Sequence, residues 1–252
     1  MKKVIFSAVL ASGVFFAANA SDEVAAEHHD AAIEESSAFD GFYFGLGFHA
    51  ANTGEKNEFI WNDGFVDKES DDSTTRLGGS LVTGFGKKIS SSRAYVGIEA
   101  GLDFAPNSVN MHMAKFSDSA QPASRYYDLI TRRNGLTPSL ALRFGFTDCS
   151  TRILTYIKAG ASYAKSTEYY IEWAGGNPIV GPSENKLSGV TPIVALGIEK
   201  GCGKKMTGRL ELEYKFGKNK TKTFDDGAST KLTQKDALTL RAMVCYNVKL
   251  GS

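Results

Sequence analysis

Apolar and polar side chains alternate strictly along the stretch from Asp40 to His49. One set of positions holds Phe42, Phe44, Leu46 and Phe48, and the other holds Tyr43, Gly45, Gly47 and His49. A β-strand directs successive side chains to opposite faces, so this stretch predicts a strand with one apolar face and one face of glycines and polar-tipped rings. Soluble β-sandwiches bury the apolar face, whereas membrane barrels turn it towards lipid and pack small and polar groups inside.

The same alternation recurs along the chain and predicts eight strands. Their ranges are Asp40–His49, Arg76–Gly86, Tyr95–Phe104, Thr137–Phe146, Ile153–Ala164, Val190–Glu199, Thr207–Phe216 and Ala237–Val248. Strands of about ten residues cross a bilayer when they are tilted. The connections alternate between long and short, and the long ones are Ala51–Thr75, Ala105–Leu136, Lys165–Gly189 and Gly217–Asp236. Outer-membrane barrels have this rhythm because their periplasmic turns are minimal and their extracellular loops extend.

Charged residues within these strands fall on the face opposite the aliphatic one. The interior of an eight-stranded barrel is just wide enough to be filled by side chains. A lone charge in such an interior is costly, so we expect the enclosed acids and bases to pair with one another. The members of this lumen charge network that we expect near the strand midpoints are Glu99, Arg143, Lys158, Glu211 and Arg241.

The sequence therefore predicts an all-β fold, an eight-stranded antiparallel up-and-down transmembrane β-barrel with four long extracellular loops and short periplasmic turns. The alternative is a secreted lipocalin-like barrel or a β-sandwich, in which the same apolar face would form the interior. Alternation alone does not separate the two. Aromatic residues at the strand ends favour the membrane barrel, because they would form a girdle at each interface. They are Phe42, Phe85, Phe104, Tyr163, Phe216 and Tyr246.

The start of the chain indicates secretion. Two lysines precede an apolar run from Val4 to Phe16, and Ala18-Asn19-Ala20 matches an A-x-A cleavage site. His28 and His29 follow in an acidic stretch, where such a pair could ligate a metal but is more commonly just solvated. We expect a signal peptide at 1–20, a flexible acidic periplasmic lead-in at 21–38 and an outer-membrane β-barrel at 39–252.

Composition removes several classes of function. The formal net charge is +1, so no global bias points to nucleic acid or to an acidic substrate. The three cysteines include no CxxC pair, and we expect neither a zinc site nor a cofactor. Cys149 and Cys202 both fall in short turns, and we hypothesise a disulfide between them, with Cys245 left as an inward free thiol.

Parts of the chain resemble a known family. Residues 1–20 followed by Gly41–Gly47, and then Tyr156–Tyr163 and Thr191–Glu199, are similar to the OmpA-like and opacity-type eight-stranded outer-membrane proteins, a porin family of surface antigens. The resemblance covers the whole barrel and implies a location in the bacterial outer membrane. Members of this family are surface antigens, adhesins, narrow pores and structural envelope proteins. Such barrels end in an aromatic residue read by the barrel-assembly machinery, whereas this chain ends Leu250-Gly251-Ser252.

On this scaffold the long loops are the surface that is free to vary, so we expect function to lie there. Tyr, Trp and Arg dominate binding hot spots, and the candidate contact residues are Trp61, Tyr126, Tyr127, Arg132, Arg133 and Trp173. These residues favour an adhesin or surface antigen that binds a host-surface or extracellular ligand. The other expected partners are outer-membrane lipid, lipopolysaccharide and the assembly machinery.

Three alternatives remain open: a small pore or solute-binding barrel, a structural envelope protein, and a lipid A-modifying enzyme. Catalysis would need a serine, a histidine and an acid that converge at the membrane edge. His49 points inward, and the sequence places no serine with an acidic partner beside it. We therefore predict that the protein is not an enzyme.

Overall fold

The computed structural model describes residues 39–60, 66–89, 93–106, 108–115, 125–133, 135–148, 152–174, 177–202, 205–223 and 229–248. The predicted signal peptide and lead-in, together with Trp61 and Cys149, lie outside these ranges. All the regular structure described is β-strand. Among the described residues no helix has the length and apolar character to span a membrane.

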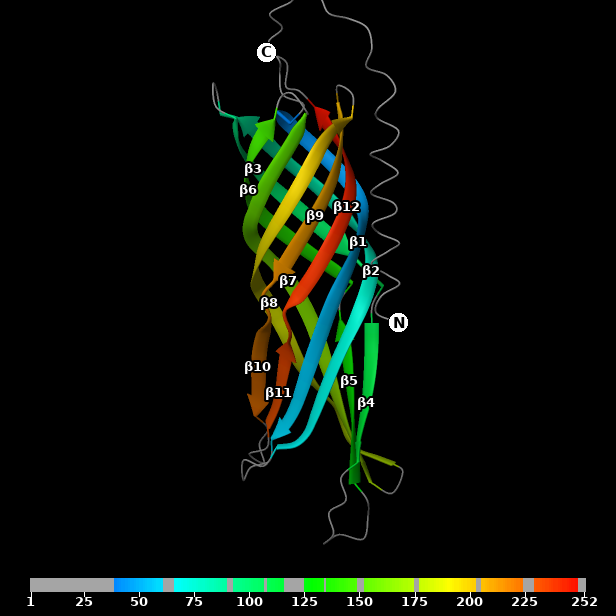
Figure 1. Cartoon of the computed structure of the whole chain (residues 1–252). Coiled ribbons are helices and arrows are strands. Elements are labelled where there is room, and N and C mark those ends of the chain that lie inside the picture. The colour runs from blue at the N-terminus through cyan, green and yellow to red at the C-terminus, as the bar shows by residue number, and fades with distance from the viewer. Residues whose placement is uncertain are drawn as a thin grey trace, which may run out of the picture.

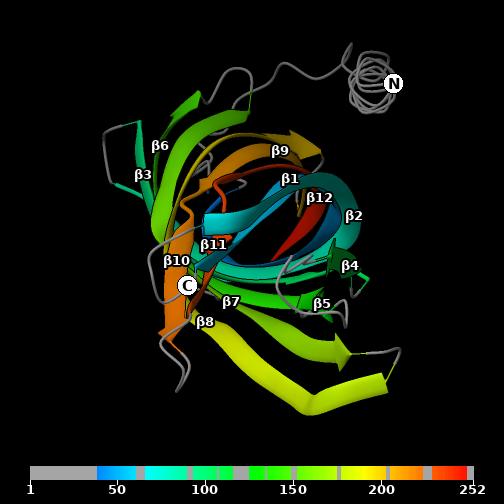
Figure 2. The ribbon, with the colours of Figure 1, turned by 90° about the horizontal axis from the view of Figure 1, so that it is seen from below.

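Eight of the strands form a closed ring. They are β1 (Gly41–Ile60), β2 (Val66–Lys88), β3 (Ala94–Phe104), β6 (Leu136–Asp148), β7 (Ile153–Ala174), β8 (Asn177–Cys202), β9 (Met206–Lys215) and β12 (Ala237–Val248). Each strand pairs antiparallel with the next, and β1 pairs with both β2 and β12, which closes the barrel (Figure 2). The predicted eight-stranded antiparallel up-and-down barrel is confirmed.

The side chains of the ring are arranged with the apolar set outside. Along β1 the exposed fraction is 64% for Leu46 and 77% for Phe48. Tyr43, whose side chain points to the other face, is 1% exposed. The same alternation holds in β6 and β12. The aromatic residues predicted for the girdles are all exposed on the outer surface. Phe42, Phe85 and Tyr246 lie at the end of the short connections, the turn end, and Phe104, Tyr163 and Phe216 lie at the opposite, loop end.

The long connections are built largely of strands, of which the sequence pattern indicates only one short hairpin, at 58–67. Four short strands are added there: β4 (Ser108–Lys115), β5 (Arg125–Arg133), β10 (Lys218–Thr223) and β11 (Ser229–Gln234). β1, β2, β7 and β8 also continue past the barrel (Figure 1). The reason is that a hairpin ladder can continue through backbone hydrogen bonds alone, and these segments are too polar to show an apolar face in the sequence.

Beyond the barrel the ring divides into two four-stranded sheets. Hairpin sheet 1 has the order β10-β11-β1-β2, because β11 replaces β12 as the partner of β1 from Glu55 onwards. Hairpin sheet 2 has the order β4-β5-β7-β8. A hydrogen bond joins the two sheets, from Ser166 Oγ to Glu55 Oε1 at 3.2 Å. Both sheets project from the loop end (Figure 1).

Candidate functional site: the lumen and the loop end

A layer of arginines and glutamates fills the middle of the lumen. Strand alternation directs Glu99 of β3, Arg143 of β6, Glu199 of β8 and Arg209 of β9 inward, and each is at most 3% exposed. Arg143 Nη2 lies 2.7 Å from Glu199 Oε2, and Arg209 Nη1 lies 2.5 Å from Glu99 Oε2. Arg209 Nη2 also lies 3.0 Å from Glu199 Oε2. Each charge in this layer therefore has an opposite charge within contact distance.

A second group of charges continues the network towards the loop end. Lys158 Nζ lies 2.5 Å from Glu211 Oε1 and 3.4 Å from Glu99 Oε1, so it links the two layers. Arg241 contacts Glu211 at 3.0 Å, Glu213 at 2.8 Å and Asp103 at 2.5 Å. Burial of these charges is tolerable because each one is paired and hydrogen-bonded.

The five residues proposed from the sequence all lie in this connected group. Glu99, Arg143, Lys158, Glu211 and Arg241 are each 5% exposed or less. The tyrosines that complete the layer, Tyr43 and Tyr156, have no role predicted from the sequence. Their inward register and the glycines opposite them are the signal that could have identified them.

The tyrosines Tyr43 and Tyr156 pack between the charges. The Arg143 guanidinium lies 3.9 Å from the ring centroid of Tyr156, and the Arg209 guanidinium lies 5.1 Å from that of Tyr43. Both hydroxyls donate to glutamates at 2.8 Å, Tyr43 to Glu99 and Tyr156 to Glu211. Rings and guanidiniums thus alternate across the barrel and fill its cross-section.

Glycines on the neighbouring strands make room for these rings. A side chain at Gly84 would overlap the ring of Tyr43, and a side chain at Gly197 would overlap that of Tyr156. Towards the turn end, buried Phe39 and Leu154 form an apolar cluster with Tyr95 and Tyr156. The described part of the lumen is therefore packed from the turn end to the charge network.

A histidine, a serine and an aspartate do meet in the lumen, which corrects the expectation that none would lie beside His49. Ser80 Oγ donates to Asp103 Oδ1 at 2.7 Å and lies 3.0 Å from His49 Nδ1. In a hydrolase the histidine accepts the serine proton and the acid orients the histidine. Here the serine stands between the other two and gives its proton to the acid, so its oxygen is not activated for attack.

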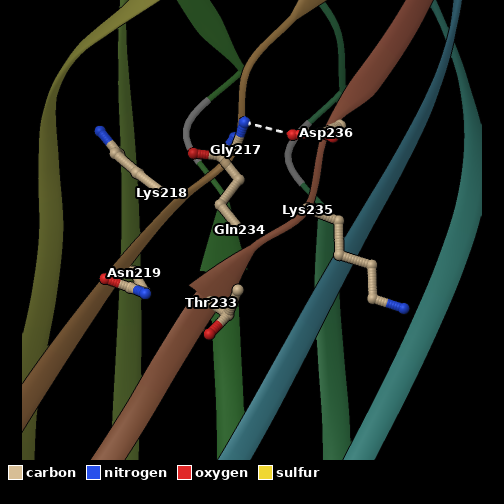
Figure 3. Close-up of a pocket in the computed structure, with 7 residues that line it drawn as sticks. All are labelled: Gly217, Lys218, Asn219, Thr233, Gln234, Lys235 and Asp236. Carbon is tan, nitrogen blue, oxygen red and sulfur yellow. Dashed lines mark hydrogen bonds between the residues drawn. The ribbon is translucent and has the colours of Figure 1, made fainter.

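Two hollows lie on the loop-end side of the charge network. A chamber of about 70 Å³ is lined by residues that include His49, Arg76, Asp103 and Lys215. An open hollow of about 730 Å³ lies at the base of the β10–β11 hairpin (Figure 3). Gln234 lines both, so the two hollows adjoin. Among the described residues no cluster of three or more His, Cys, Asp or Glu could hold a metal ion.

The candidate contact residues fall on hairpin sheet 2 where the structure describes them. Tyr126 of β5 is the direct register partner of Trp173 of β7, although 46 residues separate them in the sequence. Tyr127, Arg132 and Arg133 lie on the same β5 strand. Trp61 lies outside the described residues. The strand pairing thus brings together candidates from the second and third long connections.

The cysteines are free in the described part of the chain. Cys245 is fully buried and faces the lumen, where it packs with Tyr43. Cys202 is exposed and carries a free thiol, and its proposed partner Cys149 lies outside the described residues. The Cys149–Cys202 pairing stays a prediction. Intact mass after alkylation, with and without prior reduction, tests it.

The comparisons with known proteins concern fold alone. No protein-family model matches the sequence, and no curated protein matches it. The outer membrane protein OprG from Pseudomonas aeruginosa aligns at 12% identity and a TM-score of 0.49, over 83% of this chain and 97% of OprG. The outer membrane protease OmpT from Escherichia coli aligns at 9% and 0.47, over 82% of this chain and 97% of OmpT.

A third similar structure is Ail, the attachment invasion locus protein of Yersinia pestis, in complex with the heparin analogue sucrose octasulfate. It aligns at 11% identity and a TM-score of 0.35, over 81% of this chain and 99% of Ail. Because these identities are near one tenth and each TM-score is below 0.5, no activity or ligand is carried over from these proteins to this chain.

Proposed function

We propose that this chain is a bacterial outer-membrane β-barrel of the OmpA-like or opacity type, which presents its hairpin sheets as a binding surface for an extracellular partner. Its lumen serves as a rigid core.

The inverted distribution of side chains carries the membrane placement. Leu46, Leu196 and Phe48 are each more than 60% exposed, while arginines and glutamates are buried in the lumen. In water each square ångström of exposed apolar surface costs about 25 cal/mol, so a soluble protein would turn these faces inward. Facing lipid, the same surface is favourable, and the aromatic bands at both ends suit the two interfaces.

The packed charge network favours a scaffold over a pore. Ions would have to pass the layer in which Arg143 stacks on Tyr156. In the same layer Arg143 is paired with Glu199, and Arg209 is paired with Glu99. We expect no stepwise conductance when the refolded protein is reconstituted in planar bilayers. Regular single-channel steps would instead support the pore alternative.

The hairpin sheets supply the rigid surface that a binding role needs. Extended ladders hold loop residues in fixed positions, which lowers the entropy lost on binding. Tyr126 and Trp173 occupy opposing positions in the β5–β7 ladder. Tyrosine and tryptophan are among the residue types that anchor protein interfaces.

An array of immobilised host-surface proteins and glycans tests the binding role. The folded protein should bind at least one spotted molecule, and the double variant Tyr126→Ala, Trp173→Ala should lose most of that binding. Thr221→Ala, an exposed change on β10 in the other hairpin sheet, serves as the matched control. A slower gel mobility after boiling verifies that each variant is folded. If the folded protein binds none of the spotted molecules, or if the double variant binds as well as the unmodified protein, the role given to hairpin sheet 2 is contradicted.

A further inference from the structure

Exposed lysines lie just beyond the apolar band at the turn end, the end of the barrel opposite the hairpin sheets (Figure 1). Lys87 follows exposed Phe85 on the outer face of β2, and Lys200 follows exposed Ile198 on the outer face of β8. Residues two apart in a strand share a face and are separated by about 7 Å. Both lysines therefore continue the outer face of the barrel directly past its apolar band.

A third exposed lysine, Lys205, lies directly before β9. Its Nζ is 6.0 Å from the ring centroid of Tyr246, an exposed member of the turn-end aromatic band. Such a contact keeps the ammonium charged and close to the ring. In the ring of strands β8 and β9 are neighbours, whereas β2 lies on the opposite side. The turn-end cations Lys87, Lys200 and Lys205 are therefore distributed on both sides of the barrel.

The acids described at the turn end do not neutralise these lysines. Asp40 accepts the backbone N–H of Lys88 at 2.7 Å, and half-buried Asp148 is engaged elsewhere. Among the described residues no carboxylate forms an ion pair with any of the three turn-end cations. The turn residues outside the described ranges, 90–92, 149–151 and 203–204, include no acid and one further lysine. The outer rim of the turn end is therefore positively charged.

The position on the outer face indicates which anion fits these lysines. In a membrane barrel the aromatic bands lie at the two interfaces, and the lipid headgroups surround them. A lysine at this level can keep its methylene stem against apolar surface while its ammonium reaches a headgroup phosphate. A basic residue close to anionic lipid strengthens the association by about fivefold.

We propose that the turn-end cations bind the phosphates of anionic phospholipids, of the phosphatidylglycerol type, in the leaflet that surrounds the turn end. The inference rests on the proposed membrane placement and is independent of the binding role of the hairpin sheets. Because the lysines lie on opposite sides of the barrel at the edge of its apolar band, phosphates held there would fix the depth of the barrel in the bilayer.

Electron paramagnetic resonance with spin-labelled lipids tests the proposal. The refolded protein is reconstituted in phosphatidylcholine bilayers, and the association of labelled phosphatidylglycerol is measured relative to that of labelled phosphatidylcholine. The unmodified protein should favour phosphatidylglycerol. The triple variant Lys87→Gln, Lys200→Gln, Lys205→Gln should lower this relative association by up to about fivefold.

The matched control removes the same charge from hairpin sheet 1, with Lys56→Gln, Lys220→Gln and Lys231→Gln on β1, β10 and β11. It should retain the preference of the unmodified protein. A heat-dependent gel shift verifies that each variant is folded. If the turn-end triple variant loses this shift, its three single variants replace it.

A loss of preference confined to the turn-end variants supports the proposal. Equal preference in all the proteins would overturn it, and the acidic stretch that precedes Phe39 would then be the better partner for these lysines. A similar loss in the control would also overturn it, because the attraction would then follow net charge alone. Failure of the unmodified protein to insert into the bilayers would instead contradict the membrane placement and the inference with it.

Discussion

Arg143 illustrates how single residues make the barrel interior possible. Its guanidinium pairs with Glu199 at 2.7 Å and stacks over the Tyr156 ring, 3.9 Å from the ring centroid. The Arg143 side chain is 1% exposed. Removing one partner from a buried ion pair leaves the other partner charged and unpaired. The cost of that change is much larger than the net value of the pair itself.

We therefore expect Arg143→Met to lower the free energy of unfolding by about 3–5 kcal/mol. Urea titration of the protein in lipid bilayers, followed by tryptophan fluorescence, measures it. The control is Lys231→Gln, which removes a partly exposed pair with Glu58 and should cost less than about 1 kcal/mol. Similar small losses in both variants would show that the lumen is hydrated and that its charges do not depend on one another.

Asp236 provides a residue-scale test outside the barrel wall. A hydrogen bond from the Tyr214 hydroxyl, and a second from the Gly217 N–H, hold the pKa of Asp236 below its ordinary value. A carboxylate with a lowered pKa adds stability above its unfolded pKa, and that stability is lost as the pH falls through the folded pKa. This local contact should therefore loosen only in acid.

Tyr214→Phe removes the first of these donors, so the pKa of Asp236 should rise towards that of an ordinary aspartate. Carbon-detected NMR titration of the side-chain carboxyl measures the change. The carboxyl of Glu58, whose pKa is lowered by hydrogen bonds from Lys56 and Lys231, should titrate as before. An unchanged Asp236 titration would mean that the tyrosine contact is absent in solution.

At the scale of elements, the sequence predicts the barrel strands closely. The range predicted for the last strand, 237–248, agrees with β12. The third differs from β3 by one residue at its start, and the seventh differs from β9 by one residue at each end. Alternation with an apolar face carries this information, because that face is imposed by the surroundings of the barrel. Where β1 and β2 leave the barrel, both faces become polar and the signal disappears.

The depth of a strand residue should decide the cost of a charge on the outer face. Leu46 pairs in register with Leu81 and Val244 near the middle of the barrel, whereas Val190 pairs with Tyr163 at the loop-end aromatic band. Leu46→Arg should cost about 2–4 kcal/mol of unfolding free energy, and Val190→Arg about 0–1 kcal/mol. Urea titration in bilayers compares the unfolding free energies of the two variants. Equal costs would show that the bilayer midplane does not lie at the level of Leu46.

The contacts within the lumen cannot be predicted from strand alternation, because they depend on the register in which the strands pair. Inward positions for Glu99, Arg143 and Lys158 follow from strand period, but their partners come from strands far apart in sequence. The meeting of Ser80 with His49 and Asp103, and the register of Tyr126 with Trp173, depend on the stagger between strands. Alternation fixes the face of a residue and leaves its height in the barrel undetermined.

At the scale of the whole molecule, one boundary organises everything else. The apolar band around the ring, the enclosed charges and the polar hairpin sheets each suit a different surrounding, namely lipid, protein and water. This division also explains why a chain with +1 net charge and 23% charged residues can bury so many ions. The acids and bases neutralise one another in the lumen, whereas on the outer face lipid would leave them without water and without partners.

Methyl NMR of the protein in nanodiscs tests this boundary most directly. Lipids spin-labelled near the end of the acyl chain should broaden the methyl signals of Leu46, Leu196 and Leu212, while a water-soluble gadolinium chelate should leave them sharp. The buried methyls of Ile193 and Val82 should resist both agents better than these three. Broadening of the three leucines by the chelate but not by the labelled lipid would contradict the account.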